Sequence, residues 1–215
     1  MTKIPKPAST VVLVDDLLRV YLTKRPITMK FMGGFHVFPG GSVDLEDNDH
    51  VIESEHVRNF TQSEPFSFAY YIAAARELFE EVGILLCSSE DGLPLQFKRK
   101  TEMEYRRQLV NKEISFSQML KQEELHLDLG SLKYFGHRIT PEWRPFRFDT
   151  RFFLAKLPKD QVPKPDTNEI DEACWIFPDE ALLAFKEGKV SMANATVIAL
   201  QTLINYKEGG PLMMP

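Results

Sequence analysis

The stretch from Ala74 to Ile84, AARELFEEVGI, constrains the fold of this chain most strongly. Read as a helix at about 100° per residue, it places its glutamates within one arc of about 100°. The opposite side carries an apolar stripe, and Gly83 can end the helix because glycine adopts the left-handed conformation at little cost. The pattern therefore predicts a helix with one buried face and one acidic face. The acidic residues are Glu77, Glu80 and Glu81, and the stripe is formed by Tyr71, Ala75, Leu78, Val82 and Leu85.

The acidic face of this helix allows two interpretations. Carboxylates at positions i, i+3 and i+4 repel one another by a few tenths of a kcal/mol per pair. A hard cation such as Mg²⁺ or Mn²⁺ takes oxygen ligands and would remove this repulsion. The alternative is a solvated acidic face with a single ion pair between Arg76 and Glu80, one turn apart.

The composition is that of an ordinary globular protein, and we expect one domain over residues 1–215. The chain has no apolar run of about 18 residues, and its first residues, MTKIPKPAST, lack the apolar core of a secretory signal. Cys87 and Cys174 each stand in an apolar context. We therefore expect a cytoplasmic protein with two buried thiols and no membrane partner. A net charge of −5 argues against a nucleic-acid binder.

Strand and helix patterns alternate along the chain, which predicts an α/β fold with a mixed sheet. An acidic, irregular stretch covers residues 42–64, and Ser115 with Gln118 forms a capping-box pattern within a two-part helical segment, 93–125. Strands are expected at 9–14, 18–24, 133–139, 148–157 and 172–177. Helices are expected from Pro65 to Val82, with Ser63 as cap, and over 178–186 and 193–206.

The helix sequence RELFEEVGI resembles the second half of the Nudix box, Gx5Ex7REUxEExGU, in which U is apolar. The first half is represented by Gly41, with Asp47 where the box has Glu. Between Gly41 and Arg76 lie 34 residues where the box has 13, which makes 21 extra residues, and the insertion within the box is placed in the stretch 42–64. The matching residues are Arg76, Glu77, Leu78, Glu80, Glu81, Gly83 and Ile84.

A second motif lies upstream. The stretch YLTKRPITMKFMGGFHVFPGG resembles LLTxRSx3Rx3Gx3FPGG, which marks the coenzyme A diphosphatases within the Nudix superfamily. Three positions depart, namely Tyr21 for Leu, Pro26 for Ser and Lys30 for Arg. Lysine keeps the charge of arginine but loses its planar fork. The positions in register are Leu22, Thr23, Arg25, Gly34, Phe38, Pro39, Gly40 and Gly41.

The resemblance implies a Nudix-type α/β/α sandwich with a mixed β-sheet and extra helices. It implies hydrolysis of a diphosphate that joins a nucleoside to another moiety, and coenzyme A or acyl-coenzyme A would give 3′,5′-ADP and (acyl-)4′-phosphopantetheine. It also implies Mg²⁺ or Mn²⁺ on Glu77, Glu80 and Glu81, with Arg76 orienting these glutamates. The partner is then a small-molecule nucleoside diphosphate derivative, and a homodimer is compatible with this expectation.

Three alternatives to this function stay open from the sequence. The same chemistry can act on ADP-ribose, NADH or a dinucleoside polyphosphate. A Nudix-type domain can also bind a nucleotide without cleaving it. Finally, the acidic helix can be structural and have no ligand at all.

Substrate-binding residues are expected in the upstream motif, where glycine lets the backbone approach a phosphate or metal closely. The charge of the diphosphate would be met by Lys24, Arg25 and Lys30, although this basic cluster can also be a solvated strand end. The other expected contacts are Gly34, Phe38, Gly40 and Gly41.

For the general base, the resemblance implies a loop acid near the downstream strand, and Glu169 is the first candidate. Glu172 and the helix glutamates, among them Glu81, are the alternatives. A cluster of arginines among aromatic residues can grip a nucleotide, or it can be a strand pair with surface arginines. These arginines are Arg138, Arg144, Arg147 and Arg151.

Overall fold

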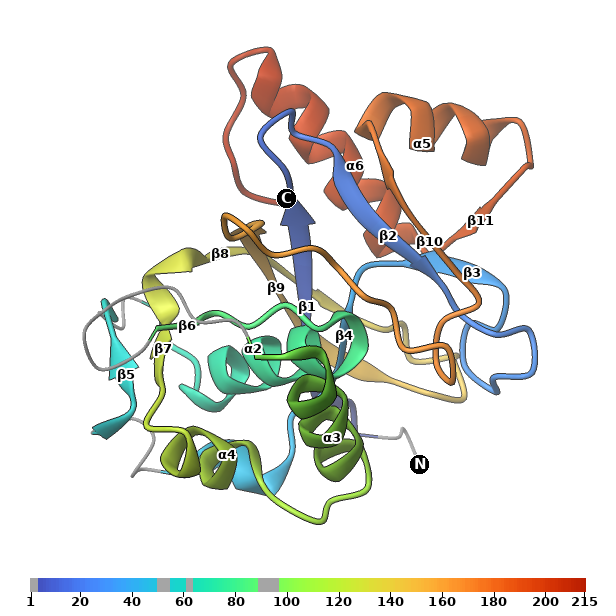
Figure 1. The fold of residues 1–215 in the computed structure, drawn as a ribbon. Coiled ribbons are helices and arrows are strands. Elements are labelled where there is room, and N and C mark those ends of the chain that lie inside the picture. The colour runs from blue at the N-terminus through green and yellow to red at the C-terminus, as the bar shows by residue number, and fades with distance from the viewer. Residues whose placement is uncertain (1–3, 50–54, 61–63, 89–96) are drawn as a thin grey trace.

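A computed structural model describes residues 4–49, 55–60, 64–88 and 97–215 of the chain (Figure 1). A mixed sheet has the strand order β11-β3-β2-β1-β9-β8, with β10 added to β2 and β4 added to β1. A small sheet has the order β5-β7-β6. The strands are β1 (Lys6–Val14), β2 (Val20–Lys24), β3 (Phe35–Val37), β4 (Gly40–Ser42), β5 (Val57–Arg58), β6 (Cys87–Ser88), β7 (His126–Asp128), β8 (Leu132–Ile139), β9 (Phe148–Lys156), β10 (Glu172–Ile176) and β11 (Ser191–Met192).

Helices cover both faces of the main sheet. Helix α2 lies with α3 and α4 on one side of it, and α5 and α6 lie on the other, as Figure 1 shows. This is the α/β/α arrangement that the resemblance predicts. The helices are α2 (Ala69–Val82), α3 (Arg99–Val110), α4 (Phe116–Gln122), α5 (Pro178–Lys186) and α6 (Asn194–Lys207), with short 3₁₀ turns η1 (Leu45–Asn48) and η2 (Leu129–Ser131).

Strand β1 is the centre of the main sheet. Along one edge it pairs in parallel with β9 over its whole length, from Lys6 opposite Phe148 to Val14 opposite Lys156. Its other edge is shared, because β2 pairs with one end and β4 with the other. The last residues of the glycine-rich stretch form β4. This pairing fixes the glycines in space.

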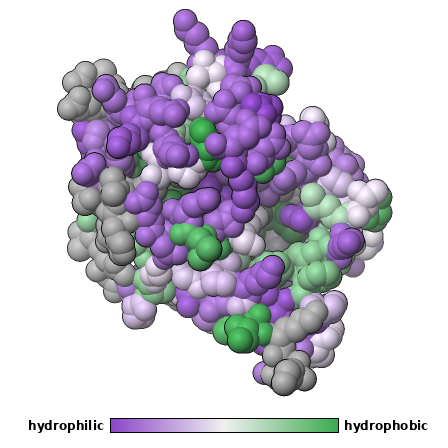
Figure 2. Space-filling view, turned by 90° about the horizontal axis from the view of Figure 1, so that it is seen from below, coloured by the Kyte–Doolittle hydropathy of each residue, from purple (hydrophilic) through white to green (hydrophobic). Residues whose placement is uncertain are grey.

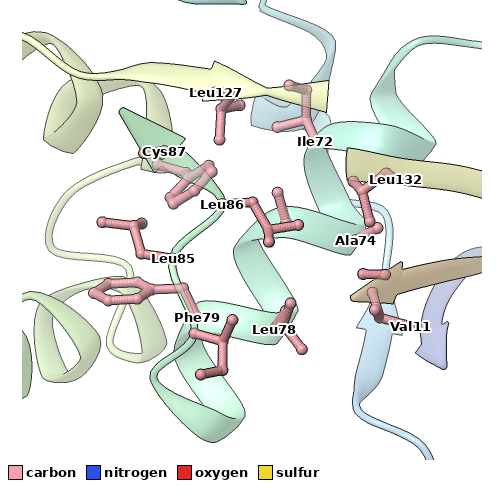
Figure 3. Close-up of a cluster of buried hydrophobic side chains, with 14 of the residues drawn as sticks. Val11, Ile72, Ala74, Leu78, Phe79, Leu85, Leu86, Cys87, Leu127 and Leu132 are labelled. Atoms are coloured by element: carbon pink, nitrogen blue, oxygen red, sulfur yellow. The ribbon is translucent and has the colours of Figure 1, made fainter. Parts of the chain in front are cut away.

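The core consists of one hydrophobic cluster on each face of the sheet. Alternate residues of β1 point to opposite sides, so Val11 packs toward α2 while Val12 packs toward α6. Figure 3 shows the cluster around α2, in which Leu78 and Phe79 are fully buried. The apolar stripe predicted for the helix is therefore its buried face.

The two-part helical segment is confirmed as α3 and α4 for residues 97–125, while residues 93–96 lie outside the described residues. The capping box is present: Gln118 N donates to Ser115 Oγ at 3.1 Å, and Ser115 N donates to Gln118 Oε1 at 2.8 Å. The expected strands and the helices after residue 125 appear within three residues of their predicted bounds, and the largest difference is the start of β1 at Lys6.

Two sequence expectations need correction. Helix α2 begins at Ala69 and not at Pro65, because Phe66 turns inward and stacks on Tyr71, and the expected cap Ser63 lies outside the described residues. Cys174 is exposed while Cys87 is buried. The neighbours of Cys174 in β10 pack on the core, and strand alternation turns its own side chain outward. Within the described residues, no helix is both long and apolar enough to cross a membrane.

Candidate active site on helix α2

A buried ion pair joins α2 to the insertion. Arg76 donates from Nε to Asp47 Oδ1 at 3.0 Å and from Nη2 to Asp47 Oδ2 at 2.9 Å. The side chains of Arg76 and Asp47 are 8% and 2% exposed, so this two-point pair is shielded from water. Asp47 belongs to η1, and thus the aspartate at the position of the box glutamate is brought to the helix despite the intervening residues.

The same guanidinium contacts three more groups. Nη1 donates to Glu77 Oε1 at 2.9 Å and lies 3.4 Å from the Glu80 carboxylate, while Nη2 also donates to the carbonyl of Ser42 at 2.9 Å. Arg76 thereby ties together η1, the end of β4 and two of the helix glutamates. Burial by itself lowers the pKa of Arg76, but the hydrogen bond with Asp47 and the charge of Glu77 raise it overall, so the residue stays a cation.

The adjacent glycines bring the backbone against the other glutamate. Gly40 N donates to Glu81 Oε2 at 3.1 Å. A Cβ atom on Gly40 would lie 2.3 Å from the carbonyl oxygen of Ser9, and one on Gly41 would lie 2.4 Å from Glu77 Oε1. Both positions need glycine for this close approach. The FPGG motif and the acidic face of α2 therefore lie against each other, although 34 residues separate Gly41 from Arg76 in the chain.

The C-terminal end of α2 is held by residues that lie outside the two sequence motifs. Arg106 of α3 donates from Nε to the Glu80 carbonyl and from Nη2 to the Glu81 carbonyl, both at 3.0 Å. The backbone N–H of Asp166 donates to the Glu81 carbonyl at 2.8 Å. These bonds satisfy carbonyls that a helix end leaves free, and they fix the backbone that carries both glutamates.

A cavity of about 250 Å³ opens beside the acidic face of α2. Glu77, Glu80 and Glu169 line it together, which brings the loop candidate for the general base to the helix glutamates. Glu172 is instead exposed and bonded to Lys24 Nζ at 2.6 Å. The remaining walls come from η1, α3 and the α3–α4 connection, which lie at the bottom of Figure 1. Figure 2 looks at the molecule from this side, and the face is largely hydrophilic. Of the two loop candidates for the general base, Glu169 lines the cavity and Glu172 does not.

Burial raises the pKa values of the carboxyl groups in this site. The pKa of Glu80 rises to about 7, although Arg76 opposes the shift. Burial and the neighbouring Glu77 raise the pKa of Glu81 well above its ordinary value. Burial and Asp166 raise that of Glu169, against the charge of Arg25. Negative charge in this site is therefore only partly compensated by the protein.

A divalent cation fits the chemistry of this donor set, because the helix presents buried carboxylate oxygens whose charge is under-compensated. Glu77 and Glu80 face Arg76, and Glu81 faces the Gly40 N–H. Among the described residues, no three acidic, histidine or cysteine side chains form a preformed metal site. The carboxylates would have to turn from these protein donors to a bound ion.

The remaining candidates of the upstream motif differ in position. Phe38 is 3% exposed and packs in the core cluster under α6, so it does not line the cavity as a substrate contact would. Gly34 has φ +78° in the turn before β3, and Arg25 Nε donates to the carbonyl of Phe31 within the same turn. Lys30 is exposed on this turn.

The arginine-rich segment does not line the cavity. Arg151 pairs with Asp149 and lies over the ring of Tyr70, and Arg147 donates to the Thr140 carbonyl at 3.1 Å. The guanidinium of Arg144 lies 4.2 Å from the ring centre of its exposed neighbour Trp143. These contacts agree with the interpretation as a strand pair with packed surface arginines.

The fold and this site match a known class of protein. The crystal structure of a Nudix hydrolase from Alicyclobacillus acidocaldarius superposes with a TM-score of 0.87 at 26% identity, with all of both chains covered. The family model of the NUDT19 Nudix domain matches residues 50–203. The chain belongs to the Nudix hydrolases, and within them to the family of the NUDT19 Nudix domain.

Two relatives agree with this assignment. Nudix hydrolase 7 of Caenorhabditis elegans, a putative enzyme by its name, is 29% identical over 201 residues, which cover 94% of this chain and 61% of that protein. Acyl-coenzyme A diphosphatase NUDT19 of Xenopus laevis is 28% identical over 232 residues, with 87% and 60% covered. The chain spans about 60% of the length of these relatives. The resemblance to the coenzyme A diphosphatase branch of the Nudix superfamily is confirmed.

The buried pair between Arg76 and Asp47 generates a stability prediction. Asp47→Asn should lower the free energy of unfolding by about 3 kcal/mol, since it leaves part of a buried cation unpaired. Denaturant unfolding measures the change. Asp16→Asn is the matched control, because Asp16 is 80% exposed in its pair with Lys156 and should contribute less than about 0.5 kcal/mol. Equal losses in both variants would contradict the role given to the buried pair.

The raised pKa of Glu80 predicts a pH dependence of stability in the metal-free protein. A carboxyl group that titrates near pH 7 when folded and near 4.5 when unfolded stabilises the fold below pH 4.5. This stabilisation, of the order of 3 kcal/mol, is lost as the pH rises through about 7. Glu80→Gln should flatten the fall in Tm between pH 5 and 8, measured in a chelator. A fall as steep as that of the wild type would show that Glu80 does not cause it.

Proposed function

We propose that this protein catalyses the metal-dependent hydrolysis of a nucleoside diphosphate linked to another moiety, with coenzyme A or acyl-coenzyme A as substrate. The products are 3′,5′-ADP and 4′-phosphopantetheine or its acyl derivative. The observation that carries the proposal is that the FPGG glycines lie directly against Glu77 and Glu81, and that Glu77 and Glu80 line a polar cavity together with Glu169. The name of the Xenopus relative, acyl-coenzyme A diphosphatase, supports the choice of substrate.

In the proposed reaction, water attacks one phosphorus of the diphosphate, and the bond from that phosphorus to the bridging oxygen breaks. Glu77, Glu80 and Glu81 would hold Mg²⁺ or Mn²⁺, which neutralises phosphate charge and acidifies water when bound. Arg76 keeps Glu77 and Glu80 in place through its contacts with both. The glycines at 40 and 41 let the backbone approach Glu81 and Glu77 closely because they carry no side chain.

Glu169 accepts the proton of the attacking water on a carboxylate oxygen. It lines the same cavity as Glu77 and Glu80, and its pKa is raised by burial. A base with a pKa nearer the working pH accepts a proton more readily than an ordinary glutamate. Glu172, exposed and paired with Lys24, lacks both features.

Product analysis tests the proposed substrate directly. The purified protein is incubated with Mg²⁺ or Mn²⁺ and, in parallel, with coenzyme A, acyl-coenzyme A, ADP-ribose, NADH and a dinucleoside polyphosphate. We expect 3′,5′-ADP from the two coenzyme A substrates at the highest kcat/KM. Faster cleavage of ADP-ribose, NADH or the polyphosphate would assign the site to that substrate instead. Binding without any cleavage would favour a nucleotide-binding domain.

Replacement of a proposed metal ligand should lower the activity while the protein stays folded. Glu77→Gln and Glu81→Gln should each lower kcat by at least about 100-fold, since several kcal/mol of charge stabilisation is lost. Both variants should stay folded, because neither glutamate belongs to the apolar face that packs α2 on the sheet. Steady-state kinetics and thermal unfolding measure the two effects. Near-normal turnover in both folded variants would show that these residues hold no catalytic metal.

A matched pair of variants, Glu169→Gln and Glu172→Gln, tests which residue is the general base. Glu169→Gln should lower kcat and alter the acidic limb of the pH–rate profile, while the Mg²⁺ concentration for half-maximal activity stays nearly the same. Glu172→Gln should change neither, because that side chain is exposed and bonded to Lys24. The opposite result, a loss of kcat at Glu172 only, would move the role of the base to that residue.

Lys30 allows a test of substrate selectivity. It stands where the family motif has arginine, and we propose that its charge reads the 3′-phosphate of coenzyme A. Lys30→Ala should raise KM for coenzyme A by about tenfold, the scale of a charged hydrogen bond, and Lys30→Arg should lower it. Dephospho-coenzyme A should respond far less. A constant ratio of the two kcat/KM values in all three proteins would exclude Lys30 as the reader of this phosphate.

A further inference from the structure

Helix α3 ends at a left-handed residue that is not glycine. Its C-cap is Asn111, and the next residue, Lys112, has φ +56°. Lys112 N donates to the Leu109 carbonyl at 2.9 Å, and Glu113 N donates to the Gln108 carbonyl at 2.8 Å. This is the Schellman pattern, in which the left-handed residue is usually glycine because a Cβ atom disfavours that conformation. Here a lysine occupies the glycine position.

The side chain of this lysine reaches the site. Lys112 lines the cavity together with Glu77, Glu80 and Glu169, and its Nζ lies 3.0 Å from Asp44 Oδ2. The Lys112 and Asp44 side chains are 65% and 32% exposed, so the pair is open to water and weak. Lys112 can therefore exchange Asp44 for another anion at little cost.

The charges around the cavity show what Lys112 can supply. Six acidic side chains line it, and among the described lining residues the bases are Arg76 and Lys112. Arg76 is committed to Asp47 and to two helix glutamates, with both ends of its guanidinium in use. Lys112 is thus the lining cation that no buried carboxylate holds. The acidic residues are Asp44, Glu46, Asp47, Glu77, Glu80 and Glu169.

We infer that Lys112 is a substrate-binding residue that leaves Asp44 and binds a phosphate group of the substrate. This inference rests on the proposed function, because it takes a nucleoside diphosphate derivative as the ligand. Lysine carries a compact charge on a flexible stem, which suits a residue that exchanges one anion for another. Glycine would suit this left-handed backbone better, so the helix end itself does not require a lysine here.

A purely structural role makes the opposite predictions. If Lys112 only joined α3 to the insertion through Asp44, either partner of the pair could be removed with the same result. If Lys112 binds phosphate, Asp44→Asn frees the lysine and should lower KM, whereas Lys112→Gly should raise it. The two single variants therefore distinguish the two roles.

The experiment compares four variants with the wild type in Mg²⁺. Lys112→Gly should raise KM for coenzyme A and the inhibition constant for inorganic pyrophosphate by about tenfold, with kcat changed less than about threefold. Its Tm should rise by about 2 °C, because glycine relieves the left-handed conformation. Lys112→Arg should keep KM within about threefold of the wild type, and Asp44→Asn should lower KM.

Glu124→Gly is the matched control. Glu124 follows α4 with φ +50°, and Leu125 N donates to the Leu120 carbonyl at 2.8 Å, so the backbone motif is the same. Glu124 is exposed and does not line the cavity. Its replacement should raise Tm in the same way but leave KM unchanged.

The outcomes separate this inference from the proposed function. Turnover by the wild type with an unchanged KM in Lys112→Gly would overturn the inference and leave the function standing. Equal increases of KM in Lys112→Gly and Asp44→Asn would overturn it in favour of the structural pair. Absence of turnover by the wild type on every nucleoside diphosphate derivative would overturn the proposed function and the inference together.

Discussion

The buried pair between Arg76 and Asp47 is the interaction on which the site depends. Helix α2 packs its apolar face on β1, and this packing leaves a guanidinium in a shielded place that needs a carboxylate partner. Asp47 supplies it, and the same guanidinium then reaches the end of β4 and two glutamates. Hydrophobic packing therefore sets the position of the helix, while one cation sets the positions of the groups proposed to do the chemistry.

The insertion breaks the box in the sequence but not in space. Lengthening a loop from 13 to 34 residues costs less than about 1 kcal/mol in closure entropy, so a strong contact such as the Asp47 pair readily compensates. The longer connection also contributes to the site, because its 3₁₀ turn η1 forms one wall of the cavity. Another wall comes from the α3–α4 connection, later in the chain. Elements outside the box motif thus decide the shape and charge of the space in front of the glutamates.

Sequence reasoning succeeds where periodicity or a motif governs the structure. The stripe of α2, the strands of the main sheet and the meeting of Gly40 with Glu81 all follow from such patterns. It fails where tertiary packing decides: Phe66 shortens α2, and Phe38 matches a motif yet serves the core. Arg106 and Lys112 reach the site only through the docking of α3, which no spacing rule in the chain encodes.

The parallel pairing of β1 with β9 has a consequence for biosynthesis. Strand β1 carries both β4 and the packing surface of α2, but its partner along the opposite edge begins at Phe148. A ribosome must therefore translate most of the chain before the sheet beneath the acidic helix can close. Until then the apolar face of α2 lacks part of its packing partner, so a nascent chain that stops short of β9 exposes apolar surface that the finished sheet buries.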